Sequence, residues 1–156
     1  MTERRTWHAL VRIGDEELAL ALAAVAAITL PPRVARVPGT RPCVVGLAHW
    51  REELLPVFAP HDLLGMKPFR QTPETRALIF DATEPFCLIV DAVQGVQQLS
   101  AVQIAGVVAL RCAPITSGCT SDPSQPDAAR HALLDPCRVW ALLERELAPA
   151  LDAQAS

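Results

Sequence analysis

Short apolar runs, separated by proline, glycine and charged residues, recur along the whole chain. Runs of about four to eight apolar residues with such boundaries are typical of buried β-strands. Two of these runs, residues 44–50 and 54–58, are joined by the charged cluster Arg51-Glu52-Glu53. We therefore predict a β-hairpin in the middle of the chain, with its charged residues exposed at the tip.

The same pattern predicts strands on both sides of this hairpin and two helical turns between them. An alanine-rich turn is expected at residues 21–25. A second turn is expected at residues 61–65, where Gly65 ends it because glycine readily adopts a left-handed conformation. The further predicted strands are residues 10–13, 17–20, 28–30, 76–80, 86–90, 96–99 and 132–134.

Other segments predict turns and loops. Residues 91–93 are interpreted as a turn, and Ser100 as the cap of a short turn that leads into residues 107–111. Residues 66–73 are expected to form a polar linker. Residues 114–127 contain proline, serine, glycine and aspartate without periodicity, so we expect a flexible surface loop that tolerates shortening.

The end of the chain predicts a helix. Asp135 is a favourable N-cap and Pro136 a favourable first helical residue. The positions that follow supply a broad apolar face of Val139, Trp140, Leu142, Leu143 and Leu147. Many short strands in two halves, followed by one terminal helix, predict a mainly β protein of two small barrels. The composition alone also allows a sandwich.

The size and composition of the chain narrow the class of protein. A chain of 156 residues with 51% hydrophobic and 20% charged residues is typical of one globular domain. A net charge of -3 and the absence of tyrosine argue against a nucleic-acid-binding surface. The longest apolar run, residues 18–30, is shorter than the roughly 20 residues of a membrane span and follows acidic residues, so we expect a cytoplasmic protein without membrane insertion.

Catalytic and metal-binding patterns are weak in this sequence. The five cysteines form an odd, irregularly spaced set, which favours reduced thiols over a disulfide framework. His49, Asp62 and a cysteine provide nucleophile, base and orienting groups, but no motif of a hydrolase accompanies them. The set Cys112, Cys119, His131 and Cys137 lacks the short spacing of a zinc knuckle. We therefore expect no enzyme activity, no metal and no cofactor.

The hairpin segment resembles the CheW-like chemotaxis adaptors. That family has a Gly-(Val/Leu)-x-Asn-x-Arg-Gly turn followed by a Pro-(Val/Ile) strand, and Gly46, Leu47, Arg51, Pro56 and Val57 match this pattern. The resemblance covers nearly the whole chain. Further similar segments are residues 14–20, residues 25–28, residues 88–93 with the family's Val-Asp-x-Val, and residues 133–136 with its closing Leu-Leu-Asp. Residues 36–42 are similar to the PilI-type adaptors of type IV pilus chemosensory systems.

The resemblance implies a fold and two protein partners. The expected fold is two intertwined SH3-like five-stranded β-barrels with a C-terminal helix, in one domain over residues 1–150. Subdomain 1 would span residues 14–70. Subdomain 2 would span residues 75–150 and include the N-terminal strand, with residues 151–156 as a tail. The implied partners are the tip of a methyl-accepting chemoreceptor and the regulatory domain of a CheA-type histidine kinase.

The sequence departs from the family pattern at the hairpin, where His49 replaces the family's Asn and Glu52 replaces its turn Gly. An altered partner preference is the natural interpretation. The alternative is a degenerate module that binds an unrelated partner or associates with itself. For Arg51 the two interpretations are a contact with a partner carboxylate and a solvated charge; for Trp50 they are an exposed anchor and a core residue. The candidate partner-binding residues are Ile28, His49, Trp50, Arg51, Glu52 and Glu53.

Overall fold

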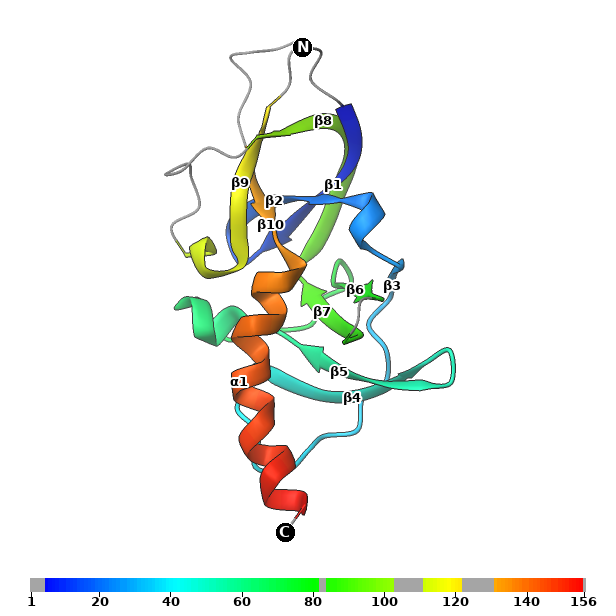
Figure 1. The fold of residues 1–156 in the computed structure, drawn as a ribbon, viewed down its shortest axis with the longest axis vertical. Coiled ribbons are helices and arrows are strands. Elements are labelled where there is room, and N and C mark those ends of the chain that lie inside the picture. The colour runs from blue at the N-terminus through cyan, green and yellow to red at the C-terminus, as the bar shows by residue number, and fades with distance from the viewer. Residues whose placement is uncertain (1–4, 82–83, 103–110, 122–130, 156) are drawn as a thin grey trace.

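The computed structural model describes residues 5–81, 84–102, 111–121 and 131–155. Within these ranges the chain forms ten β-strands, three 3-10 helices and one α-helix (Figure 1). The strands form two groups, with one long helix beside them. The prediction of a mainly β protein with a C-terminal helix is confirmed.

The first group of strands closes into a barrel. Its order is β1-β2-β10-β9-β8, and every neighbouring pair is antiparallel except β10 and β2, which are parallel. The inner face carries aliphatic side chains such as Val11, Ile13 and Leu18, none of which is exposed. The five strands are β1 (Arg5–Ile13), β2 (Glu16–Ala21), β8 (Ala92–Val102), β9 (Thr116–Ser121) and β10 (Ala132–Leu134).

The second group is a five-stranded sheet in the order β3-β6-β7-β5-β4. Its edge strands β3 and β4 share no ladder in the described residues. The segment after β3 instead crosses to the outer edge of β4, where Ala35 and Leu47 exchange two backbone hydrogen bonds of 2.8 and 2.9 Å. The strands are β3 (Ala27–Thr29), β4 (Val44–Trp50), β5 (Glu53–Phe58), β6 (Arg76–Phe80) and β7 (Phe86–Val90).

The two groups are interleaved along the chain. The barrel combines the first two strands with the last three, whereas the sheet is made of the five strands between them. The intertwining implied by the resemblance is therefore present. The two groups do not coincide with the expected subdomains at residues 14–70 and 75–150. Strand β2 lies in the barrel, and both β6 and β7 lie in the sheet.

One hydrophobic core joins the barrel to the sheet. Strands β6 and β7 are buried on both faces: Leu78 and Leu88 point into the core shared with the barrel, whereas Ile79 and Cys87 belong to a second cluster. Burial on both faces explains why these strands are continuous apolar runs rather than alternating ones. The larger cluster contains residues of both groups, so the two subdomains share one hydrophobic core.

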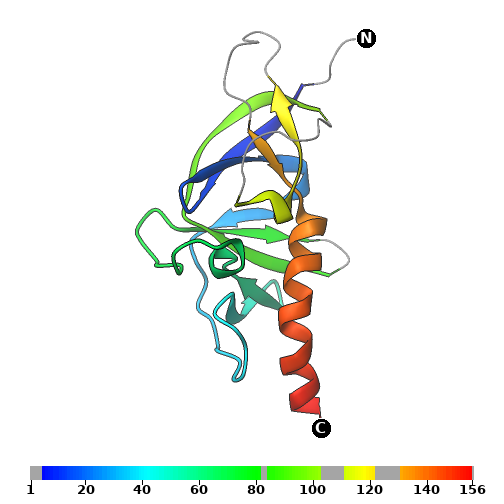
Figure 2. The same cartoon turned by 90° about the vertical axis from the view of Figure 1, so that its left-hand side faces the viewer.

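Helix α1 (Pro136–Ala155) covers this core along one side of the molecule (Figure 2). It begins as predicted, because Asp135 Oδ1 accepts hydrogen bonds from the backbone N–H of Cys137 at 2.9 Å and Arg138 at 3.4 Å. Its Trp140 ring lies 6.2 Å from the ring of Phe58 and 5.6 Å from that of Phe86. Residues 151–155, expected as a tail, are helical.

The three 3-10 helices are η1 (Leu22–Ala24), η2 (His61–Leu64) and η3 (Ala113–Ile115). The first two lie in the predicted helical turns at residues 21–25 and 61–65. Gly65 follows η2 with a φ of 70° and donates its N–H to the carbonyls of that turn, so the predicted glycine cap is confirmed.

Two expectations about the second half are wrong. Residues 92–93, predicted as part of a turn, begin β8, where they pair with Val11 and Arg12 of β1, and the predicted cap Ser100 is buried inside that strand. Residues 116–121, predicted as part of a flexible loop, form β9 between β8 and β10. Within β9, Cys119 and Thr120 are buried, so this part of the segment will not tolerate deletion. The predicted turn after Ser100 and the end of the predicted loop fall on residues 103–110 and 122–127, which lie outside the described residues.

Asp91 lies where the chain passes from the sheet to the barrel. Its carboxylate accepts a hydrogen bond from the Gly14 N–H, in the β1–β2 turn, and lies 2.7 Å from His61 Nε2, in η2. Gly14 has a φ of 63°, and a Cβ there would come within 2.6 Å of Met66 Sδ. The turn of the barrel therefore packs tightly against the segment that contains η2 and Met66, and the Asp91 carboxylate connects the turn to His61.

Candidate partner-binding surface

The β4–β5 hairpin ends in a two-residue turn that projects from the sheet, on the side away from the C-terminus of α1 (Figure 1). Trp50 pairs with Glu53, which makes Arg51 and Glu52 the central residues of the turn. Both have a positive φ, of 47° and 68° respectively. Positive φ at both central positions is the signature of a type I′ turn, whose twist matches that of β-strands. The predicted hairpin and its exposed tip are confirmed.

Glu52 adopts the backbone conformation for which glycine is best suited. A left-handed conformation costs an L-residue about 1–2 kcal/mol because its Cβ approaches the following carbonyl oxygen. The Glu52 side chain is exposed and makes no hydrogen bond or ion pair with other described residues. Nothing in the described structure therefore offsets the cost of this residue at the turn.

We expect Glu52→Gly to raise the free energy of unfolding by about 1 kcal/mol, because it removes this backbone strain. The melting temperature should rise by about 2–4 °C, which thermal denaturation can measure. The neighbouring Glu53→Gly variant is the control, since Glu53 is in extended β5 and glycine weakens a strand. Equal stabilisation by both changes would contradict the strain at Glu52.

Trp50 is both a core residue and a platform for Arg51. Strand alternation places it on the same face as the buried Ala48, and it packs against the second hydrophobic cluster. The Arg51 guanidinium carbon lies 4.5 Å from the centroid of the Trp50 ring, a cation–π contact. The structure thus resolves the two interpretations of Trp50: its ring is half-buried, and Arg51 is held over it.

The outer face of the hairpin presents an apolar side chain beside polar ones. His49 is exposed and pairs across the strands with Leu54, whose side chain is 59% exposed. The apolar pattern predicts Leu54 in a buried strand, and Leu54 is not one of the candidate residues named from the sequence. Cross-strand partners share one face of a sheet, so the pairing of Leu54 with the polar His49 indicates that Leu54 lies on the exposed face.

Charge is distributed unevenly around the tip. The side chains of Glu52 and Glu53 are exposed and make no ion pair with other described residues, whereas Arg51 is stacked on Trp50. The hairpin therefore offers a positioned guanidinium, two free carboxylates and the apolar Leu54 within four consecutive residues. These groups are able to recognise a protein surface but have no arrangement suited to catalysis.

Ile28 is not a neighbour of the hairpin in the sheet. Ile28 lies on β3, the edge strand opposite to β4, with three strands between them. It is 38% exposed, and Leu30, just beyond the strand, is 68% exposed. Ile28 is thus part of a separate exposed edge rather than of the hairpin surface.

The thiols near the hairpin are poor nucleophiles. Burial, with Asp62 nearby, raises the pKa of the Cys43 thiol to about 11, and burial raises that of Cys87 to about 12. Both thiols are therefore protonated at neutral pH, and their reactive thiolate forms are scarce. Across the described part of the chain, no three His, Cys, Asp or Glu side chains gather in a way that could hold a metal ion.

Comparisons with known proteins identify the family. A model of the CheW-like domain matches residues 8–138, and the chain therefore belongs to the CheW-like domain family. The crystal structure of the scaffolding protein TtCheW from Thermoanaerobacter tengcongensis superposes with a TM-score of 0.70 and 16% sequence identity. The match covers 86% of this chain and 87% of that one, and at this identity it shows a shared fold. A search of curated proteins finds no match. As a CheW-like domain, the chain belongs to a class of adaptors that are not enzymes.

Proposed function

We propose that this protein is a cytoplasmic scaffold that couples the tip of a methyl-accepting chemoreceptor to the regulatory domain of a CheA-type histidine kinase. Membership of the CheW-like family supports the adaptor role. The observation that carries the proposal is the projecting hairpin, with Arg51 fixed over Trp50 at the position of the family's arginine. An adaptor needs such pre-organised contact groups because it acts by holding two partners together.

The similarity of residues 36–42 to PilI-type adaptors supports a type IV pilus system as the pathway. No helix in the described ranges has the length and apolar character to cross a membrane. In this proposal the receptor provides the membrane attachment, and the kinase carries out the chemical reaction. The adaptor therefore requires no cofactor, and it contacts no nucleic acid.

We expect Arg51→Glu to weaken binding of at least one partner by about 2 kcal/mol or more, roughly 30-fold in Kd, because an attraction at the contact becomes a repulsion. Calorimetry should be carried out separately with a kinase regulatory domain and with a receptor-tip fragment. The protein should still fold, because the change affects an exposed side chain and one cation–π contact of about 0.5–1 kcal/mol.

Arg145→Glu makes the same charge change on the exposed side of α1 and is the matched control. It should leave both affinities unchanged. Unchanged affinity of Arg51→Glu for both partners would show that the hairpin arginine has no role in partner binding. Failure of the unsubstituted protein to bind either partner, with self-association instead, would favour the degenerate module over the adaptor.

A further inference from the structure

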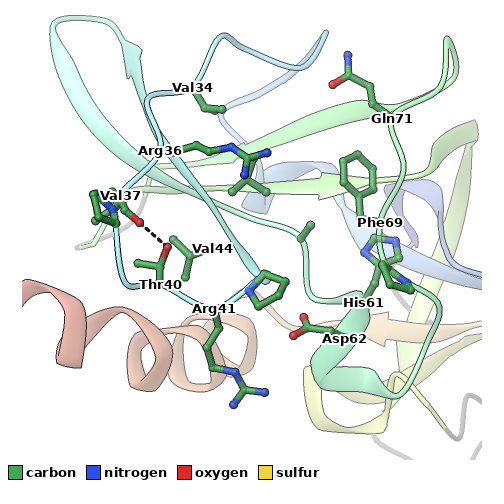
Figure 3. A pocket seen from close by; sticks show the side chains of 15 residues that line it. Val34, Arg36, Val37, Thr40, Arg41, Val44, His61, Asp62, Phe69 and Gln71 are labelled. Carbon is green, nitrogen blue, oxygen red and sulfur yellow. Dashed lines mark hydrogen bonds between the residues drawn. The ribbon is translucent and has the colours of Figure 1, made fainter.

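A hollow of about 840 Å³ opens beside the sheet, away from the hairpin tip. Three segments enclose it: the chain that leads from β3 into β4, helix η2, and the linker after η2 (Figure 3). Nine of the fifteen residues that line it are aliphatic, proline or phenylalanine. Its volume and its mainly apolar wall, with a few polar groups, are typical of a site for a small molecule.

Two walls face one another across the hollow, each with an apolar and a polar side chain. Val37 and Thr40 lie on one side and Phe69 and His61 on the other (Figure 3). The Thr40 hydroxyl donates a hydrogen bond to the Val37 carbonyl at 2.7 Å, so it is already satisfied within its own loop. His61 is 3% exposed, its Nε2 is bonded to Asp91 and its ring lies 5.4 Å from that of Phe69. The Thr40 hydroxyl and His61 Nε2 are therefore engaged within the protein, whereas His61 Nδ1 is buried and has no hydrogen-bond partner among the described residues.

Arg36 is the cation at the hollow that is available to a ligand. Its side chain is exposed and extends from its loop towards the side on which Phe69 lies (Figure 3). It makes no hydrogen bond or ion pair with other described residues. The other arginine of the lining, Arg41, lies 3.3 Å from Glu146 of α1. Asp62 lies at the end of the hollow near Arg41, away from Arg36 (Figure 3).

We propose that this hollow binds a small amphipathic anion, with its apolar body between the loop and Phe69 and its negatively charged group on Arg36. The apolar wall supplies affinity through burial, and a guanidinium is suited to bind a carboxylate through two parallel hydrogen bonds. The position of Asp62 away from Arg36 favours one anionic group rather than two. This ligand site is independent of the hairpin and of the proposed adaptor role.

The test is titration of the full-length ¹⁵N-labelled protein with decanoate, below its micelle concentration, followed by two-dimensional NMR. We expect saturable shifts confined to the residues that line the hollow. Decyltrimethylammonium, which has a similar apolar chain with a positive head group, should bind at least tenfold more weakly, because it would face Arg36. Equal binding of the two probes, or shifts spread over the surface, would overturn the proposal.

Two matched variants locate the charged contact. Arg36→Gln should weaken decanoate binding about tenfold or more, since a charge-assisted hydrogen bond is lost. Arg33→Gln removes an exposed arginine of the same segment that does not line the hollow, and it should leave the affinity unchanged. Thermal melts confirm that both variants fold. Unaltered decanoate affinity in Arg36→Gln, or an equal loss in both variants, would refute the site.

Discussion

Replacement of Phe86 with alanine is expected to lower the free energy of unfolding by about 4 kcal/mol, near the middle of the range for buried phenylalanine. The Phe86 ring is 2% exposed and contacts three other aromatic rings. Its centroid lies 4.8 Å from that of Phe80, 5.6 Å from Trp140 and 6.2 Å from Phe58. Truncation therefore leaves a cavity where the sheet meets α1, which neither element can close without losing its other contacts.

Chemical denaturation measures this effect, and the melting temperature should fall by roughly 8–16 °C for a chain of this size. Leu54→Ala is the control, because it removes a large apolar side chain that is 59% exposed and should cost less than about 0.5 kcal/mol. Phe86→Leu should recover most of the loss. A cost for Phe86→Ala as small as that for Leu54→Ala would mean that the aromatic cluster does not hold the helix against the sheet.

Replacement of Asp91 with alanine is expected to cost about 3 kcal/mol at neutral pH, because it leaves the partly buried Gly14 N–H and the buried His61 Nε2 without their acceptor. The exposed Asp81 provides a matched Asp→Ala control, which should be nearly neutral. If the two substitutions were equally mild, the junction between barrel and sheet would not depend on this carboxylate.

The same variant has a defined dependence on pH. Burial alone would raise the pKa of the Asp91 carboxyl, but hydrogen bonds from His61 and Gly14, with the nearby Arg12, outweigh it and hold the pKa below its ordinary value of 3.8. A lowered pKa in the folded state stabilises the protein above the unfolded-state value, and this stabilisation is lost as the pH falls through the folded-state value. The difference in stability between the unsubstituted protein and Asp91→Ala should therefore shrink as the pH falls below about 4.

Local patterns were sufficient for the elements that bury whole runs of side chains. The strands at residues 44–50, 76–80 and 86–90 have the predicted bounds, because short apolar runs that are bounded by charged, proline or glycine residues are typical of buried strands. The helix start at Asp135 also depends on local hydrogen bonds alone. The sequence likewise placed the exposed charged tip at residues 51–53, since a two-residue connection between paired strands must lie at the surface.

Long-range pairing decided the rest. Strand β9 has no apolar pattern of its own and is a strand because β8 and β10 provide partners on both sides. Residues 92–93 are extended because β1 pairs with them from the other end of the chain. The tertiary structure alone placed Arg51 over the Trp50 ring and exposed Leu54, since strand alternation defines two faces but not which of them meets the core. The tertiary structure also brings Gly14, His61 and Asp91 together. These residues lie in three segments that are far apart in the sequence, so no local pattern predicts their contact.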